Sequence, residues 1–302
     1  MDRSLHNRET RLGLLYGLGS YLWWGGVPIY FHLVSHVQPL AVLAHRIVWS
    51  VVFLLLIVAA QHRWAETARV VRNRRMMLML TLGSVLVAVN WFVFIYAVTI
   101  GHVLQASLGY YICPMVNVLL GMLFLGERLR TWQWVAVGLA TTGVVYLTLQ
   151  GATFPWISLM LASSFGLYAL VRKKIIVGPV VGLLVETAIL LPAAVIIFRM
   201  PLAGWAEMTL GTFGLLSLAG VVTAVPLLWF VSAVRRLRLA TMGFLQYAGP
   251  TVQFLVAVLF LGEHLRSEQL VTFAFIWTAL IVYTADSIRA HRPPQPAVEM
   301  IE

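Results

Sequence analysis

The chain has 302 residues, of which 61% are apolar and only 11% are charged. Soluble domains carry roughly 25% charged residues, so this composition excludes an ordinary water-soluble globular protein. A net charge of +10 on a soluble protein would suggest a polyanionic partner such as nucleic acid, but here its meaning depends on where the basic residues lie.

Apolar segments long enough to cross a bilayer, which takes about 20 residues, recur along the whole chain. We predict an all-α integral membrane protein with ten transmembrane helices, at 12–31, 39–60, 76–99, 105–125, 133–150, 155–171, 180–198, 210–232, 241–260 and 268–287. The first segment follows Arg11 and has no small-residue cleavage pattern beyond it. We therefore expect a mature helix and not a signal peptide.

The basic residues alternate between the ends of these segments. All but three of the 21 Lys and Arg residues fall at one side of the predicted membrane; the exceptions are Arg46 inside a segment and Arg199 and Arg266 on the other side. Because positively charged loops stay in the cytoplasm during insertion, we expect both termini, including a tail at 291–302, to be cytoplasmic. The charge then requires no nucleic-acid partner.

A repeat divides the chain. "FLGERLR" at 124–130 returns as "FLGEHLR" at 260–266, and the same offset of 136 aligns Phe94 with Phe230, Tyr111 with Tyr247 and Pro114 with Pro250. Each unit holds five segments, an odd number, so the second unit enters the membrane from the opposite side. We predict two inverted five-helix repeats, at 1–150 and 151–290. Such halves can expose a site between them to either side in turn.

Several long motifs resemble the RarD proteins, in the EamA branch of the drug/metabolite transporter superfamily. They are "LAHRIVWS" at 43–50, "ASLGYYICPMVNVLLGMLFLGERLR" at 106–130, "SFGLYALVRKKI" at 164–175, "RLRLATMGFLQYAGPTVQFLVAVLFLGE" at 236–263 and "VTFAFIWTALIVY" at 271–283. The resemblance implies ten helices with both termini inside, a central cavity and secondary transport in the bacterial inner membrane. It names no substrate.

Polar and aromatic residues inside the segments are candidates for a substrate cavity. Pro114 and Pro250 occupy equivalent positions and are predicted to break their helices, since proline removes a backbone donor and freed carbonyls at membrane depth require protein or a wet cavity. The cavity candidates are Trp23, Trp24, Asn90, Tyr96, Tyr110, Tyr111, Asn117, Ser164, Tyr168, Trp229, Gln246, Tyr247 and Gln253, and the same segments add Trp91, Phe165 and Thr223. Interfacial belts and core packing are the alternative roles of these side chains.

Charged residues inside predicted spans are functional candidates. His45 and Arg46 lie in the second segment, and Glu186 lies in the seventh, aligned with Arg46 at an offset of 140. Glu186 and Arg46 approach from opposite membrane faces, which makes a direct salt bridge difficult. An anchor between the repeats, proton coupling at Glu186 and direct substrate contact stay open. Glu127 and Glu263 are predicted to pair with Arg130 and Arg266, three residues later, at a helix start.

No phosphate-binding loop and no H-E-x-x-H or G-x-S-x-G motif occurs in the sequence, so we expect neither ATP drive nor an enzyme. We expect no cofactor and no metal site. The sequence favours a secondary transporter, with export as the leading direction, of a small organic metabolite or drug. The partners are a small-molecule substrate and membrane lipids, and a coupling proton and a homodimer are compatible with this architecture. A scaffold or sensor that does not transport, or a channel, is the alternative.

Overall fold

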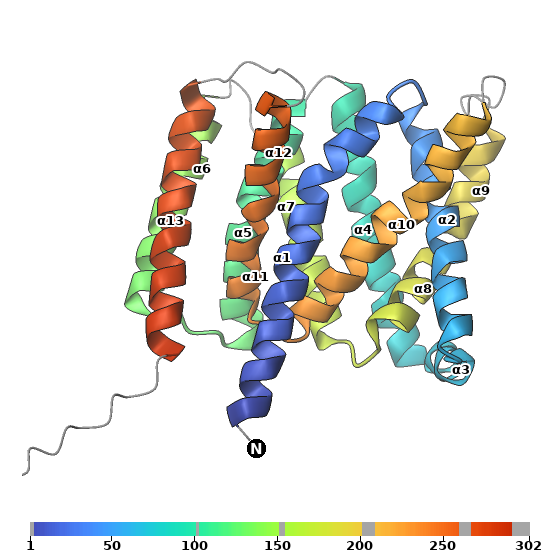
Figure 1. Cartoon of the computed structure of the whole chain (residues 1–302), viewed down its shortest axis with the longest axis horizontal. Helices are drawn as coiled ribbons and strands as arrows, with labels where there is room; N and C mark the ends of the chain where they lie inside the picture. Colours follow the sequence, from blue (N-terminus) through green and yellow to red (C-terminus); the bar gives the residue numbers. More distant parts are fainter. Residues whose placement is uncertain (1–2, 101–102, 151–154, 201–208, 260–266, 292–302) are drawn as a thin grey trace, which may run out of the picture. The chain divides into compact units, whose positions relative to one another are not determined.

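The computed structural model describes residues 3–100, 103–150, 155–200, 209–259 and 267–291, and every regular element in these ranges is a helix (Figure 1). The all-helical prediction is therefore confirmed for the described part of the chain. Seven segments there are long and apolar enough to cross a membrane: Pro39–Ala60, Arg74–Phe94, Leu108–Leu125, Thr131–Leu149, Pro179–Arg199, Leu210–Val234 and Leu270–Ala290.

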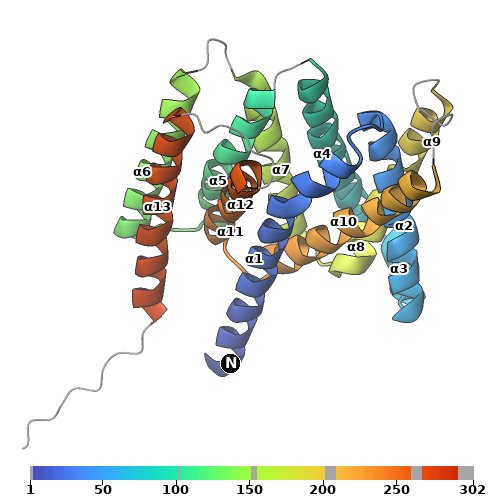
Figure 2. The same ribbon diagram turned by 45° about the horizontal axis from the view of Figure 1, so that its top comes forward.

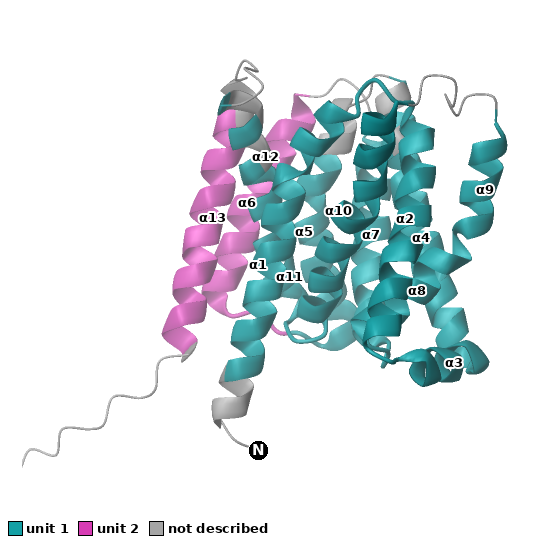
Figure 3. Cartoon of the chain, turned by 45° about the vertical axis from the view of Figure 1, so that its right-hand side comes forward, with its two compact units in different colours: residues 1–127, 153–264 teal, residues 128–152, 265–302 magenta. Residues whose placement is uncertain are grey.

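The chain forms two compact units, residues 1–127 with 153–264 and residues 128–152 with 265–302 (Figure 3). The first contains α1 (Arg3–Leu33), α2 (Pro39–Ala60), α3 (Trp64–Arg72), α4 (Arg74–Thr99), α5 (Val103–Leu125), α7 (Trp156–Lys174), α8 (Pro179–Ile189), α9 (Leu191–Arg199), α10 (Leu210–Val234), α11 (Leu239–Gln246) and α12 (Ala248–Leu259). The second contains α6 (Thr131–Leu149) and α13 (Ser267–His291). Each unit thus combines residues from both halves of the sequence.

Helices from the two sequence halves pack against each other within the first unit. The most extensive contacts pair α5 with α7, α2 with α10, α1 with α10, and α4 with α7, and Figure 2 shows α1 lying along α10 and α12. Glycine permits two of the close approaches. A Cβ at Gly220 would lie 2.3 Å from the Trp49 carbonyl, and one at Gly243 would lie 2.7 Å from the Pro114 carbonyl oxygen.

Two of the predicted segments are broken helices. Segment 180–198 divides into α8 and α9 at Leu190, two residues before Pro192, and segment 241–260 divides into α11 and α12 at Tyr247, three residues before Pro250. Proline lacks the N–H that would continue the preceding turn. The predicted break at Pro250 therefore coincides with a division of the segment.

Pro114 does not break its helix, and that part of the prediction is wrong. The helix α5 continues through Pro114 from Val103 to Leu125. Neighbouring helices can hold a continuous helix across the one hydrogen bond that proline removes. Here α7 and α11 pack on α5, and Gly243 lies directly against the Pro114 carbonyl.

A short helix, α3, occupies residues that the sequence assigned to a basic loop. Its Val70 is buried and Trp64 is 51% exposed. Glu66 in its first turn pairs with Arg63 at 2.8 Å. Residues with this one-sided burial form a surface helix that lies against the bundle.

The duplicated Gly-Glu motif does not form the pair that its spacing predicts. The Glu127 carboxylate accepts hydrogen bonds from the backbone N–H groups of Leu239 (2.8 Å) and Ala240 (3.0 Å), so it caps the start of α11. In the second unit, Arg130 pairs instead with Asp286 at 2.7 Å. The carboxylate prefers free helix N–H groups that have no intrahelical partner. Glu263 and Arg266 lie outside the described residues.

Candidate functional site

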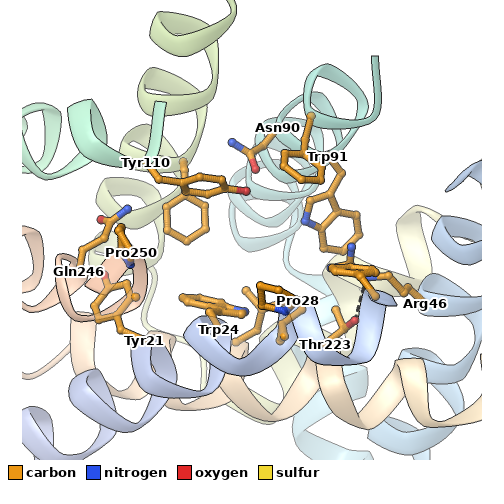
Figure 4. Close-up of a pocket in the computed structure, with 16 residues that line it drawn as sticks. Tyr21, Trp24, Pro28, Arg46, Asn90, Trp91, Tyr110, Thr223, Gln246 and Pro250 are labelled. Carbon is orange, nitrogen blue, oxygen red and sulfur yellow. Dashed lines mark hydrogen bonds between the residues drawn. The ribbon is translucent and has the colours of Figure 1, made fainter. Parts of the chain in front are cut away.

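The first unit contains a cavity of about 290 Å³ (Figure 4). Its lining is mostly aromatic and aliphatic, with a few polar groups. The lining residues are Tyr21, Trp24, Val27, Pro28, Phe31, Arg46, Asn90, Trp91, Phe94, Tyr110, Phe165, Thr223, Leu227, Gln246, Gly249 and Pro250. Cavities of this character, apolar with a few placed polar groups, are typical of sites for small organic ligands.

One face of α1 forms a long wall of the cavity. Tyr21, Trp24, Pro28 and Phe31 follow one another at spacings of three or four residues, which places them on the same side of a helix. Trp24 meets Phe165 of α7 edge to face, with ring centroids 5.8 Å apart. This helical spacing is visible in the sequence, but of these four residues only Trp24 was chosen there as a cavity candidate.

Arg46 of α2 occupies one end of the cavity. Its Nε donates a hydrogen bond to Thr223 Oγ1 of α10 at 2.9 Å. The guanidinium carbon lies 4.8 Å from the centroid of the Trp91 ring and 5.6 Å from that of Phe31. Such cation–π contacts orient a guanidinium and leave its positive charge in place.

Amide groups supply the other polar surface. Asn90 Nδ2 donates to the Leu161 carbonyl (2.9 Å) and to Ser164 Oγ (3.1 Å), which fixes the amide at the cavity wall. Gln246 Oε1 accepts from Asn117 Nδ2 at 3.1 Å. Gln246 and Pro250 lie at the opposite end from Arg46, with Trp24 between them (Figure 4).

The comparisons with known proteins place the chain in a family. Residues 11–149 match the EamA-like transporter family. The chain is 46% identical to the protein RarD of Salmonella typhimurium over 94% of this chain and 98% of that protein. The chain belongs to the RarD proteins of the EamA-like transporter family. It is also 45% identical to an uncharacterized transporter of Vibrio cholerae, over 94% of this chain and 95% of that one.

A solved crystal structure shares the fold of this chain. It aligns with a TM-score of 0.73 at 18% sequence identity and covers 94% of this chain and all of that one. At this identity the likeness supports the fold alone. Family membership makes this chain a multi-pass membrane protein of a transporter family.

The cavity brings together some of the candidates chosen from the sequence. Trp24, Asn90, Tyr110, Gln246, Pro250 and Arg46 line it, as do Trp91, Phe165 and Thr223. Two more candidates support lining residues from behind, since Ser164 bonds Asn90 and Asn117 bonds Gln246. The side chain of Gln253 lies outside the described residues.

Three aromatic candidates lie away from the cavity. Trp23 is partly exposed and meets Trp229 edge to face, with centroids 5.7 Å apart. Tyr96 is 41% exposed and contacts Phe92 and Trp156. Exposure of large aromatic side chains on a membrane protein is typical of lipid contact or of the interface belt, which was their alternative role.

The repeat-related tyrosines contact each other and not the cavity. Tyr247 is 0% exposed, and its hydroxyl donates to the Tyr111 carbonyl oxygen at 3.3 Å. The carbonyl belongs to the turn that precedes Pro114 in α5. The pair therefore joins equivalent positions of the two halves.

The polar residues around Glu186 form a separate buried cluster. Glu186 Oε1 lies 3.3 Å from Arg172 Nη1, and Oε2 accepts a hydrogen bond from the Tyr168 hydroxyl at 3.1 Å. Neither Glu186 nor Tyr168 lines the cavity. His45 also lies outside it, with its ring packed on Phe198 at 5.2 Å.

Arg172 is a polar residue whose role the sequence did not reveal. It is the first of three consecutive basic residues, 172–174, just after the predicted segment 155–171, and so it was among the Lys and Arg residues expected on the cytoplasmic side. The structure buries it to 1% exposure at the end of α7. A basic run at a span end normally indicates a wetted loop, and only the tertiary contact between α7 and α8 distinguishes Arg172 from its neighbours.

Proposed function

We propose that this chain is a secondary-active transporter that moves a small organic solute through the cavity by alternating access. One observation carries the proposal: four helices of each sequence half line a single cavity. These are α1, α2, α4 and α5 from the first half and α7, α10, α11 and α12 from the second. A site shared by two repeats can open to either side when the repeats shift against each other.

The cavity suits a small amphiphilic molecule. Its volume of about 290 Å³ lies near the lower end of ligand pockets, which hold roughly 300–1,000 Å³. Aromatic rings offer stacking surfaces, while Arg46, Asn90 and Gln246 offer polar contacts. The broken helix α11–α12 contributes Gln246, Gly249 and Pro250 to the lining, and discontinuous helices typically form the substrate site of such transporters, while the repeats rock against each other.

The proposed membrane map has ten spans. Eight are α1, α2, α4, α5, α6, α7, α10 and α13, and the pairs α8–α9 and α11–α12 make the other two. The map supports inverted repeats at 1–150 and 151–290, both termini in the cytoplasm and residence in the bacterial inner membrane. Export is the direction favoured by the family. The positive-inside distribution of the Lys and Arg residues supports this orientation.

Solute exchange in proteoliposomes tests the proposal. Vesicles that contain the purified protein are loaded with a bacterial metabolite extract, and mass spectrometry follows each solute as it leaves. A carrier releases particular solutes faster than protein-free vesicles do, and it shows saturable counterflow for them. A channel releases them without saturation, and a scaffold or sensor releases none, so either of these outcomes would reject the proposal.

A further inference from the structure

The charge of Arg46 has no counterion among the described residues. The ion pairs of the described part join Arg63 to Glu66, Arg130 to Asp286, Arg172 to Glu186, Arg236 to Glu9 and Arg238 to Glu127. Among the described residues, Arg46 makes a hydrogen bond only to the neutral Thr223 hydroxyl, through Nε. Its Nη1 and Nη2 amino groups have no hydrogen-bond partner within the described residues, and neither is among the fully buried unsatisfied atoms.

Arg172 shows the opposite arrangement. Both arginines lie inside the helix bundle, but Arg172 is neutralised by a carboxylate at 3.3 Å. Placing a cation without a counterion at membrane depth costs free energy. Where proteins keep such a residue, it faces a water-filled cavity or a functional partner. Arg46 faces the cavity, whose described lining contains no carboxylate.

The free edge of the guanidinium is suited to an oxyanion. Nε is occupied by Thr223 and the Trp91 ring lies against the guanidinium, so the Nη1 and Nη2 amino groups are the donors left for a ligand. Arginine binds carboxylates and related oxyanions through such paired, charge-assisted donors. The rest of the cavity, from Trp24 and Tyr110 to Gln246, accepts an uncharged and largely apolar body (Figure 4).

We infer that the transported solute is a small organic anion, whose carboxylate-type group binds the Nη1 and Nη2 amino groups of Arg46 and whose apolar body lies against Trp24 and Tyr110. This inference rests on the proposed function, since it names the substrate class of the same cavity. It also assigns Arg46 the role that stayed open in the sequence, direct contact with the substrate.

Three compounds with one phenyl group and different charges test the inference. Phenylacetate is anionic, phenylacetamide is neutral and phenethylamine is cationic at neutral pH. Their affinities are measured by calorimetry on the full-length protein in nanodiscs, for the parent, Arg46→Gln and Arg46→Lys. Arg69→Gln is the matched control, because Arg69 is an exposed residue of α3.

Phenylacetate should bind at least about tenfold more tightly than the other two, the scale of one charge-assisted hydrogen bond. Arg46→Gln should remove that preference, while Arg46→Lys retains part of it and Arg69→Gln all of it. The inference is overturned if phenethylamine or phenylacetamide binds best, if the preference survives Arg46→Gln, or if none of the three binds. The parent protein alone shows which of the three compounds binds best and whether any binds, so the test does not depend on stable variants. Metabolite exchange that persists in any of these cases leaves the proposed function intact.

Discussion

Arg172 and Glu186 form an ion pair in the interior of the first unit, with Nη1 and Oε1 3.3 Å apart and both residues 1% exposed. Glu186 is also held by the Tyr168 hydroxyl, and Arg172 Nε and Nη2 have no hydrogen-bond partner among the described residues. A buried pair of this kind contributes little net stability, but removing one partner leaves an uncompensated charge. Arg172, and not Arg46, is therefore the cation that depends on Glu186.

Glu186→Gln should destabilise the protein. The substitution keeps the side-chain shape and leaves the Arg172 cation buried without a counterion, which costs about 3–5 kcal/mol in free energy of unfolding. Denaturation by sodium dodecyl sulfate in mixed micelles measures this loss. Arg172→Met should restore part of it in the double variant, whereas Arg46→Met should restore none.

Proton coupling is the alternative role of Glu186. In that case Glu186→Gln folds normally and exchanges solute, but exchange no longer responds to an imposed pH gradient. A stable Glu186→Gln protein with that phenotype would contradict the structural role of the pair. If Arg46→Met restored the stability of Glu186→Gln, the pairing of Glu186 with Arg172 would be contradicted.

Tyr247 and Tyr111 should differ in their response to truncation. Tyr247 is fully buried and donates to the Tyr111 carbonyl, so Tyr247→Ala creates a cavity that costs about 3–5 kcal/mol, as for other large aromatic truncations. Tyr111 is only partly buried, and Tyr111→Ala should lower the amount of folded protein less. Tyr247→Phe should cost only about 1 kcal/mol, the scale of one hydrogen bond. The three variants are compared by their abundance in the membrane and by their melting temperature in detergent. Equal losses for both alanine variants would contradict the deeper burial of Tyr247.

Glu127 should matter as a helix cap. Its carboxylate accepts from the Leu239 and Ala240 N–H groups at the start of α11, and loss of such a cap costs about 0.5–2 kcal/mol. Glu127→Ala should therefore lower the melting temperature measurably. Glu66→Ala is the matched control, since it removes only a surface ion pair with Arg63 that contributes about 0–1 kcal/mol. A larger loss for Glu66→Ala than for Glu127→Ala would refute the cap.

Much of the helical framework follows from the sequence alone, because apolar length and positive loops are local signals. The predicted segment 39–60 coincides with α2 (Pro39–Ala60), and the predicted segment 210–232 begins with α10 (Leu210–Val234) and ends just before it does. The contacts of charged side chains could not be predicted in the same way. Arg172 resembled its loop neighbours, and Glu127 is 112 residues from Leu239 along the chain.

The candidate site was predictable to the extent that it follows helical periodicity. Trp24, Asn90 and Tyr110 line the cavity, whereas Trp23, adjacent to Trp24, faces outward because neighbouring helical residues point about 100° apart. Duplication was a weaker guide. Pro114 and Pro250 are equivalent in sequence, but different neighbours leave one helix continuous and divide the other.

The inverted repeat predicts opposite sidedness for the two Gly-Glu motifs. In a Cys113→Ala background, which removes the single cysteine, Arg128→Cys should react with a membrane-impermeant maleimide only from the cytoplasmic side. Arg266→Cys should react only from outside. Labelling is measured in intact cells, which expose the outer side, and in inverted vesicles, which expose the cytoplasmic side. Reaction of both positions from the same side would reject the inverted repeats.

The most direct test of the central claim, that the cavity carries the solute, compares Trp24→Ala with Trp64→Ala in the metabolite-loaded proteoliposomes. Trp24 lines the cavity, and Trp64 is a half-exposed tryptophan on the surface helix α3. Loss of the Trp24 ring removes apolar contact worth about 1.5–3 kcal/mol, so exchange at low solute concentration should fall by about tenfold or more per folded molecule. Trp64→Ala should exchange like the parent. Equal exchange by the parent and Trp24→Ala would contradict the claim.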